Sequence, residues 1–454
     1  MKFGGTSVED AKAIDRVAGI VKSRLAEQPF VVVSAMAKVT DQLLAMAAAA
    51  GRGEREQALE ICRSLRERHY LTAGELLQTG LHTDLHRELG AEFDSLDELL
   101  RGISAVGELT PRTSDYVVSF GERLSSMIAT AAFLAHDLPA TLLDPRQVII
   151  TDAQHSRAVP QVDEINDRLH DRVQPLLAQK RIPIMGGFVG ATREGITTTI
   201  GRGGSDFSAA LVGAGLNAER IEIWTDVDGM KTTDPRLCAN ARRIKVISFE
   251  EAAELAYFGA KVLHPATVLP AVEKNIPVLV LNSRNPANEG TRILARAPRS
   301  HSQFKAIAAK GRITVIDIVA ARMLMAHGFL SQVFEVFARH RCAVDVVSTS
   351  EVSISLTVDS NEAIPQIAAD LQELADVKYY GRKAIVCLVG ENLRDTPGVA
   401  AQIFDTIRHI NVRMISQGAS EINLTFVIDE ADVPEAVRRL HDRFFTEADP
   451  EVFD

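Results

Sequence analysis

Residues 2–7, Lys2-Phe3-Gly4-Gly5-Thr6-Ser7, are the stretch on which the interpretation of the fold depends. Adjacent glycines let backbone N–H groups approach an anion closely, and the lysine adds a positive charge, so the turn is suited to phosphate. Apolar residues recur at helical spacing over residues 8–25, so we expect the turn to open a helix, whose N-terminus also favours anions. It is not a Walker loop, because its lysine precedes the glycines. By itself, a surface turn explains these glycines equally well.

A turn of this kind normally follows a buried strand, which here would be reduced to Met1, Lys2 and Phe3. Further short apolar runs alternate with longer helical patterns, and several are apolar throughout, as strands covered on both faces are. We therefore predict an α/β fold, a three-layer αβα sandwich with a mostly parallel sheet. Residues 42–110 are predicted to be a helical excursion near the substrate cleft. The predicted strands are Phe30–Ser34, Ala140–Leu143, Ile182–Gly186, Arg220–Thr225 and Val278–Asn282.

The composition restricts the partners and the location of the protein. A formal charge of −10 argues against a nucleic acid or an anionic membrane as a partner. No signal peptide and no apolar run long enough to span a bilayer is expected, which favours a cytoplasmic protein. The four cysteines are widely separated and show no metal-binding spacing, so we expect reduced thiols.

The C-terminal part contains an internal repeat. Gly328–Phe334 resembles Gly398–Phe404, and Ser353–Thr357 resembles Glu421–Thr425. Each copy has the βαββαβ pattern of a small split-βαβ module, which serves either as a dimerisation scaffold or as a small-molecule sensor. A segment rich in Asn, Pro, Arg and Ser precedes the repeat and is the predicted linker. We therefore divide the chain into a catalytic domain (1–295), a linker and strand (296–312) and two modules (313–382 and 383–454).

Charged, glycine-rich clusters in the first 295 residues carry the chemistry. Ser119–Arg123 is predicted at a strand-to-helix junction, where Glu122 is either a helix-start charge or a ligand for a substrate ammonium group. Gly186–Gly190 follows a buried strand, at the edge where parallel sheets bind ligands. Thr197–Asp206 combines three glycines with an arginine fork for a carboxylate or phosphate and an acid able to orient a lysine or a metal.

Two later segments add charges. Trp224–Gly229 ends an apolar strand with two acids but lacks the glutamate of a calcium loop, and it leads into Thr232–Arg236, a polar loop suited to a nucleotide. Phe258–Pro265 places Lys261 beside glycine, and His264 is interpreted as a structural turn residue. No Ser-His-Asp triad is apparent. Lysines, an arginine, glycine loops and carboxylates together favour phosphoryl transfer, in which positioning and charge neutralisation do most of the work.

Together and in this order, the motifs resemble the aspartokinases of the amino-acid kinase family, with most similarity to the lysine-sensitive type with tandem ACT domains. The resemblance covers nearly the whole chain. It implies that L-aspartate and ATP, with Mg²⁺, give 4-phospho-L-aspartate and ADP, the first step toward lysine, threonine and methionine. It also implies feedback inhibition by lysine and a homodimer formed through the ACT modules. The acceptor carboxylate is already ionised at neutral pH, so no general base is required.

The resemblance also implies residue roles. Lys2 and Lys261 would neutralise the transferring phosphoryl group, and Asp206 would orient a lysine or the metal shell; no residue is predicted as a direct metal ligand. The nucleotide would contact Gly4, Gly5, Thr6, Thr225, Asp226, Lys231, Arg236 and Val262. Aspartate would contact Ser34, Thr40, Glu122, Arg202, Gly203, Gly204 and Ser205. Lysine would contact Met323, Gly328, Phe329, Leu330, Val344, Asp345, Ser350 and Glu351.

Three positions depart from the pattern of the family. Lys231 stands where a tyrosine is frequent, and Lys38 stands where glycine is usual. Ala326 replaces a serine, and one lost neutral hydrogen bond weakens lysine binding by about 0.5–1.5 kcal/mol. Three alternatives stay open: another small-acid kinase, such as a glutamate or N-acetylglutamate kinase; a non-catalytic amino-acid-sensing ACT regulatory protein with a degenerate kinase domain; and a dimeric scaffold.

Overall fold

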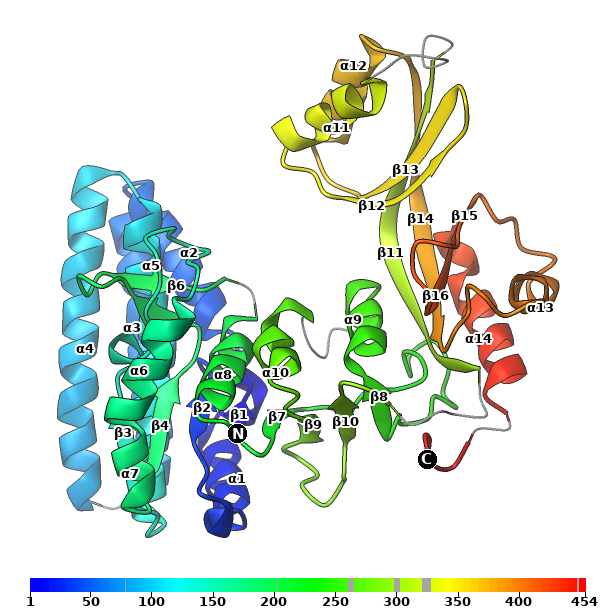
Figure 1. Ribbon diagram of the computed structural model, residues 1–454. Coiled ribbons are helices and arrows are strands. Elements are labelled where there is room, and N and C mark those ends of the chain that lie inside the picture. Colours follow the sequence, from blue (N-terminus) through cyan, green and yellow to red (C-terminus); the bar gives the residue numbers. More distant parts are fainter. Residues whose placement is uncertain (78, 202, 260–264, 298–302, 321–327, 447–448) are drawn as a thin grey trace. The chain divides into compact units, whose positions relative to one another are not determined.

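The computed structural model describes residues 1–77, 79–201, 203–259, 265–297, 303–320, 328–446 and 449–454 (Figure 1). The chain forms two compact units. The first comprises Met1–Gly229 and Val262–Ala295, and the second comprises Met230–Lys261 and Arg296–Asp454. The two units therefore differ from the predicted domains. Met230–Lys261 lies within the predicted catalytic domain (1–295) but belongs to the second unit, together with the C-terminal part of the chain.

The first unit is built on a mostly parallel sheet with the strand order β3-β4-β2-β1-β7-β9-β10. Neighbouring strands are parallel except β9 and β10, which are antiparallel. All five strands predicted from apolar runs are present, each within one residue of its predicted bounds. The strands are β1 (Lys2–Phe3), β2 (Val31–Val33), β3 (Ala140–Leu143), β4 (Ile182–Gly186), β7 (Ile221–Thr225), β9 (Val278–Asn282) and β10 (Thr291–Leu294), with a separate hairpin of β5 (Val189–Ala191) and β6 (Thr197–Thr199).

Helices contact this sheet in two separate groups, which confirms the three-layer sandwich. In one group α5 packs against β2, β3 and β4, and in the other α8 packs against β1, β2 and β7. The first group is α1 (Ala11–Lys22), α2 (Val39–Gly51), α3 (Arg55–Leu76), α4 (Thr79–Val106) and α5 (Pro111–Ala135); it contains the predicted helical excursion. The second group is α6 (Val162–Arg172), α7 (Gln174–Ala178), α8 (Gly204–Gly215) and α10 (Leu269–Glu273). Short 3₁₀ helices are η1 (Gly5–Ser7), η2 (Leu25–Glu27), η3 (Pro145–Gln147) and η4 (Pro265–Val268).

The helix α5 corrects two expectations. By length and composition it could cross a membrane, although 78% of its most apolar window is buried inside the protein, as in the core helix of a globular domain. It also contains Ser119–Arg123, which therefore lies in the middle of a helix and not at a strand-to-helix junction. The helix starts at Pro111, where the side chain of Thr110 accepts a hydrogen bond from the Thr113 N–H.

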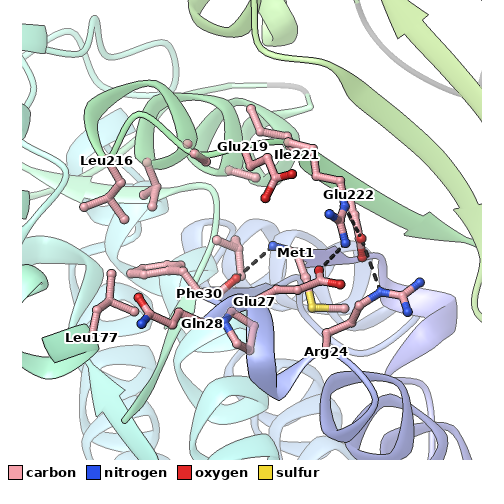
Figure 2. A pocket seen from close by; sticks show the side chains of 17 residues that line it. Met1, Arg24, Glu27, Gln28, Phe30, Leu177, Leu216, Glu219, Ile221 and Glu222 are labelled. Atoms are coloured by element: carbon pink, nitrogen blue, oxygen red, sulfur yellow. Dashed lines mark hydrogen bonds and ion pairs between the residues drawn. The ribbon is translucent and has the colours of Figure 1, made fainter. Parts of the chain in front are cut away.

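The two-residue strand β1 is held on both sides. Its Lys2 and Phe3 pair in parallel with β2 and with β7, and the Ser34 N–H donates to the Phe3 carbonyl at 3.0 Å. Figure 2 shows a hollow at the other end of β1, where the α-amino group of Met1 donates to the Phe30 carbonyl at 2.8 Å. Ligands of open parallel sheets bind at the carboxyl ends of the strands, so the glycine turn, and not this hollow, marks the functional edge.

The second unit contains a six-stranded antiparallel sheet with the order β12-β13-β11-β14-β16-β15. Its strands are β11 (Phe304–Val319), β12 (Val344–Thr349), β13 (Ser353–Asp359), β14 (Asp376–Gly390), β15 (Met414–Ser416) and β16 (Asn423–Asp429). The helices are α9 (Phe249–Tyr257), which follows the short strand β8 (Val246–Ser248), then α11 (Phe329–Arg339), α12 (Ile364–Gln372), α13 (Val399–Thr406) and α14 (Val433–Phe444), with η6 (Glu430–Asp432) before α14.

The long strands β11 and β14 run through both repeats, so the repeats share one sheet. The first repeat has the predicted βαββαβ order, from β11 through α11, β12, β13 and α12 to β14. The second repeat runs from β14 to α14, and its last strand is supplied by Phe304–Lys310, the first half of β11, which pairs with Ile385–Gly390. The segment predicted as linker and strand therefore supplies the last strand of the second module.

Candidate active site

The glycine turn is fixed by backbone hydrogen bonds at the carboxyl end of β1. The Gly4 N–H donates to the Trp224 carbonyl at 3.0 Å, and the Ala37 N–H donates to the Gly5 carbonyl at 3.1 Å. A Cβ atom on Gly5 would lie 2.9 Å from the carbonyl oxygen of Ala35, so only glycine permits this approach. The turn continues as η1 before α1 begins at Ala11.

A cavity of about 640 Å³ opens beside this turn and gathers residues from distant parts of the first unit. Many of the predicted phosphate and aspartate ligands line it: Lys2, Gly5, Ser34, Thr40, Glu122, Gly203, Gly204, Ser205 and Asp206. Lys38 also lines it, with a φ of 67° in the left-handed region that favours glycine, which gives a physical reason for the glycine that is usual at this position. These residues form the candidate active site.

Lys2 and Asp206 form an ion pair in this cavity. The Lys2 Nζ and Asp206 Oδ1 atoms are 2.7 Å apart, and their side chains are only 11% and 14% exposed. Lys2 lies on β1, whereas Asp206 lies in the first turn of α8, whose N-terminus carries the positive end of the helix dipole. A Cβ atom on Gly187 would lie 2.6 Å from Ser205 Cα, so this glycine allows the start of α8 to pack against the end of β4.

Glu122 is a buried carboxyl group with an unpartnered oxygen. Its Oε2 atom has no hydrogen-bond partner, and burial raises the pKa of Glu122 to about 8. Two glycines allow this placement: a Cβ atom on Gly186 would lie 2.9 Å from Glu122 Cβ, and one on Gly121 would lie 2.9 Å from Ala35 Cβ. A buried carboxyl group with an unpartnered oxygen at the wall of a polar cavity is suited to bind a cationic ligand group.

Asp115 lines the same cavity and was not found by the sequence analysis. Its carboxylate is 2% exposed and accepts hydrogen bonds from the Ser156 N–H, the Thr199 hydroxyl at 2.6 Å and the Thr199 N–H at 3.2 Å, and it lies 3.0 Å from His155 Nδ1. It therefore joins α5 to β6 at the rim of the site. Asp115 precedes Glu122 by two helical turns, so helical periodicity would have found it if this segment had been assigned to a helix.

The residues predicted to contact the nucleotide are not gathered in one cavity as the predicted phosphate and aspartate ligands are. Thr225 and Asp226 follow the carboxyl end of β7, where the Thr225 hydroxyl donates to Asp226 Oδ1 at 3.2 Å, and neither lines the cavity. Lys231 and Arg236 belong to the second unit. Arg236 pairs with Asp234 of its own loop at 2.6 Å and lowers the pKa of that carboxyl group. The predicted site residues Arg202, Lys261, Val262 and Met323 lie outside the described residues.

The predicted effector residues lie in the first repeat of the second unit. Gly328 precedes α11 with a φ of 85°, and Phe329 and Leu330 begin that helix. Val344 and Asp345 lie on β12. Ser350 and Glu351 form the turn after it, where the Ser350 N–H donates to the Ser353 carbonyl at 2.8 Å.

None of the cysteines is among the residues that line the cavity. All four cysteines are free. Among the described residues, one group of possible metal ligands comes together, with the ligand atoms of Cys238, His441 and Asp442 within 4.8 Å of one another. This group lies in the second unit and is separate from the cavity lining. Sequence spacing gave no signal for it, because Cys238 and His441 are distant in the chain.

Comparison with known proteins agrees with this architecture. The model of the amino acid kinase family matches residues 1–282, and a model of the ACT domain matches residues 386–444. The fold and the cavity thus define an amino acid kinase with a C-terminal ACT region. The chain is 36% identical to lysine-sensitive aspartokinase 3 of Escherichia coli (strain K12) over 98% of both sequences. It is 37% identical to chloroplastic aspartokinase 2 of Arabidopsis thaliana, covering 99% of this chain and 84% of that protein.

Solved structures give the same result. Escherichia coli aspartokinase III in complex with aspartate and ADP, described as the R-state, matches with a TM-score of 0.84 over 98% of this chain and 99% of that one. The same enzyme in complex with lysine and aspartate, described as the T-state, matches with a TM-score of 0.85 over 98% of both chains. The chain therefore belongs to the aspartokinases of the amino acid kinase family and is an aspartate kinase.

Proposed function

We propose that this aspartate kinase transfers the γ-phosphoryl group of ATP to the β-carboxylate of L-aspartate, giving 4-phospho-L-aspartate and ADP. The observation that carries the proposal is the buried carboxyl group of Glu122, with its unpartnered Oε2 atom, in the same cavity as the Lys2–Asp206 ion pair and the glycine turn. An ammonium ligand and a phosphate-binding cation thus line one space. A zwitterionic amino acid beside a polyphosphate matches this distribution of charge.

In this reaction a β-carboxylate oxygen of aspartate forms a bond to the γ-phosphorus. The bond from that phosphorus to the bridging oxygen breaks, and ADP leaves with the electron pair. The attacking carboxylate is ionised at neutral pH, so the protein supplies position and charge rather than a base. We assign the substrate ammonium to Glu122, the α-carboxylate to Arg202, and polar contacts to Ser34, Thr40 and Gly203–Ser205.

Charge neutralisation is the second task, because an anion must approach a polyanion. Lys2 and Lys261 are assigned to the transferring phosphoryl group, with Gly4, Gly5 and Thr6 around the phosphates. Mg²⁺ would supply further positive charge at the phosphates, and the Asp206 carboxylate, an oxygen donor in the cavity, would fit its hydration shell. Before substrate binds, Asp206 holds the Lys2 ammonium in the cavity. Thr225, Asp226, Lys231, Arg236 and Val262 are assigned to the rest of the nucleotide.

Regulation by lysine is part of the proposal. The effector residues named above combine a helix start, at the exposed Gly328 and the buried Phe329, with the carboxylates Asp345 and Glu351. The former suits the carboxylate of an amino acid, and the latter suit its ammonium groups. Inhibition requires lysine to bind an inactive arrangement more tightly than an active one. We further propose a cytoplasmic homodimer joined through the ACT modules, which catalyses the first step toward lysine, threonine and methionine.

The test is ATP turnover that depends on aspartate, with the acyl phosphate trapped as the hydroxamate, in the absence and presence of millimolar lysine. Aspartyl hydroxamate that decreases with lysine is the expected result. Turnover that is unchanged by lysine would support the kinase activity and contradict the proposal that lysine is an inhibitor. Hydroxamate formed from glutamate but not from aspartate would contradict the proposal that aspartate is the substrate.

A further inference from the structure

The carboxylate of Asp345 is already bound by an ammonium group of the protein itself. The Lys310 Nζ atom lies 2.9 Å from Asp345 Oδ2 and 3.1 Å from Oδ1, and the side chain of Asp345 is only 5% exposed. The Tyr257 hydroxyl also donates to Asp345 Oδ1 at 2.9 Å. The Lys310 ammonium lies 5.7 Å from the centre of the Tyr257 ring, within the range of a cation–π interaction. Asp345 thus accepts hydrogen bonds from an ammonium group and a hydroxyl group of the protein without any ligand.

These three residues come from three elements. Lys310 lies on β11, Asp345 on β12, and Tyr257 is the last residue of α9. Lys310 also pairs with Asp359 at the end of β13, at 2.9 Å, and the side chain of Asp359 is 67% exposed. Lys310 therefore keeps a carboxylate partner at the edge of the protein if Asp345 is taken by another cation. This second partner lowers the free-energy cost of displacing the Lys310 ammonium from Asp345.

We propose that Lys310 and Tyr257 set the affinity and specificity of the effector site by competing for Asp345. The inference rests on the proposed role of Asp345 as a ligand for the effector. A ligand that takes this carboxylate must bring a primary ammonium or an equivalent cation, because only such a group replaces the charge that Lys310 supplies. An effector without a cation to replace Lys310 at Asp345, such as a dicarboxylic acid, is excluded from this position.

The competition also changes the contacts of α9. When an effector takes Asp345, the Tyr257 hydroxyl loses its acceptor. Tyr257 ends α9, which is anchored at its start by a capping box of Ser248 and Glu251 and packs against β11 and β14. Along the chain, Tyr257 is four residues before Lys261, the lysine assigned to the phosphoryl group. Tyr257 is thus a positioning residue whose hydroxyl contact depends on whether an effector occupies Asp345.

The test measures lysine binding to the full chain by titration calorimetry and lysine inhibition in the hydroxamate assay. Lys310→Met removes the competing ammonium, and lysine should bind about tenfold more tightly, since a hydrogen bond to a charged group no longer has to be exchanged. Lys310→Arg restores the pairing and should return the affinity to that of the unmodified protein. Tyr257→Phe should bind lysine more tightly but reduce the largest inhibition that lysine achieves.

A matched control is available in the second repeat. Lys383 on β14 forms an ion pair with Asp429. This pair also joins a lysine on a strand to a carboxylate, but it does not involve Asp345, so Lys383→Met should leave the affinity for lysine unchanged. If the affinity for lysine is unchanged or weaker in Lys310→Met, the inference of competition for Asp345 is overturned, whereas the proposal that lysine binds at the effector site is retained. No lysine binding to any variant would overturn both the inference and the effector proposal. If Lys310→Met does not fold, Tyr257→Phe, which removes one hydroxyl, decides by the same readouts.

Discussion

Aspartate binding is predicted to release a proton from Glu122. Burial raises the pKa of Glu122 to about 8, an effect that outweighs the opposing influence of the Lys2 charge. At neutral pH the carboxyl group of the free protein is therefore about nine-tenths protonated. An ammonium group requires the ionised carboxylate, so the proton must leave when aspartate binds.

The sign and size of the pH dependence follow from this linkage. The free protein holds the proton and the complex does not, so affinity for aspartate rises with pH and levels off above the pKa. Between about pH 6 and about pH 8 the ionised fraction of Glu122 rises from about 1% to about 50%, so the dissociation constant should fall about fifty-fold. Each pH unit below the pKa weakens binding by about 1.4 kcal/mol. The ammonium group of aspartate stays charged throughout this range.

The assay is titration calorimetry with aspartate at several pH values, in buffers with different ionisation enthalpies. About 0.9 proton should be released to the buffer per aspartate at neutral pH. Glu122→Gln should bind aspartate weakly and without this pH dependence. Glu251→Gln, a buried glutamate in the capping box of α9, is the matched control and should keep the pH dependence. An affinity that is constant with pH, with no proton release, would refute the assignment of Glu122 to the ammonium.

Three further predictions concern the turn, the phosphoryl group and the effector. Gly5→Ala should lower the free energy of unfolding by about 1–3 kcal/mol in a urea titration, because its Cβ would lie 2.9 Å from the Ala35 carbonyl oxygen; unchanged stability would mean that the turn adapts. Lys261→Ala should abolish hydroxamate formation while calorimetry still detects lysine binding, and full turnover would remove Lys261 from the phosphoryl site. Asp345→Ala should abolish lysine binding, so that turnover no longer responds to lysine; persistent inhibition would exclude Asp345 as a ligand.

The parallel sheet could be predicted from local sequence because its physical cause is local. Strands buried on both faces must be apolar throughout, and β4 and β9 were predicted with their observed bounds for this reason. The phosphate turn was also visible, since adjacent glycines beside a lysine leave a signal within a few residues. The middle of α5 was misassigned, because a glycine and two charges inside a helix resemble a turn until the packing of Gly121 against Ala35 is known.

The sequence by itself determined the layers of the first unit, the repeat in the second and the inventory of charged residues at the glycine turns. Only the tertiary structure decided which of those charges meet. Lys2 and Asp206 are distant in the chain and form an ion pair because β1 ends and α8 begins at one edge of the sheet. Phe304–Lys310 closes the second repeat, and Lys310 reaches Asp345, because antiparallel pairing joins segments that no local pattern relates. Local propensity depends on a few neighbouring residues in the sequence. Which charged side chains form ion pairs depends instead on how distant segments pack together in the folded chain.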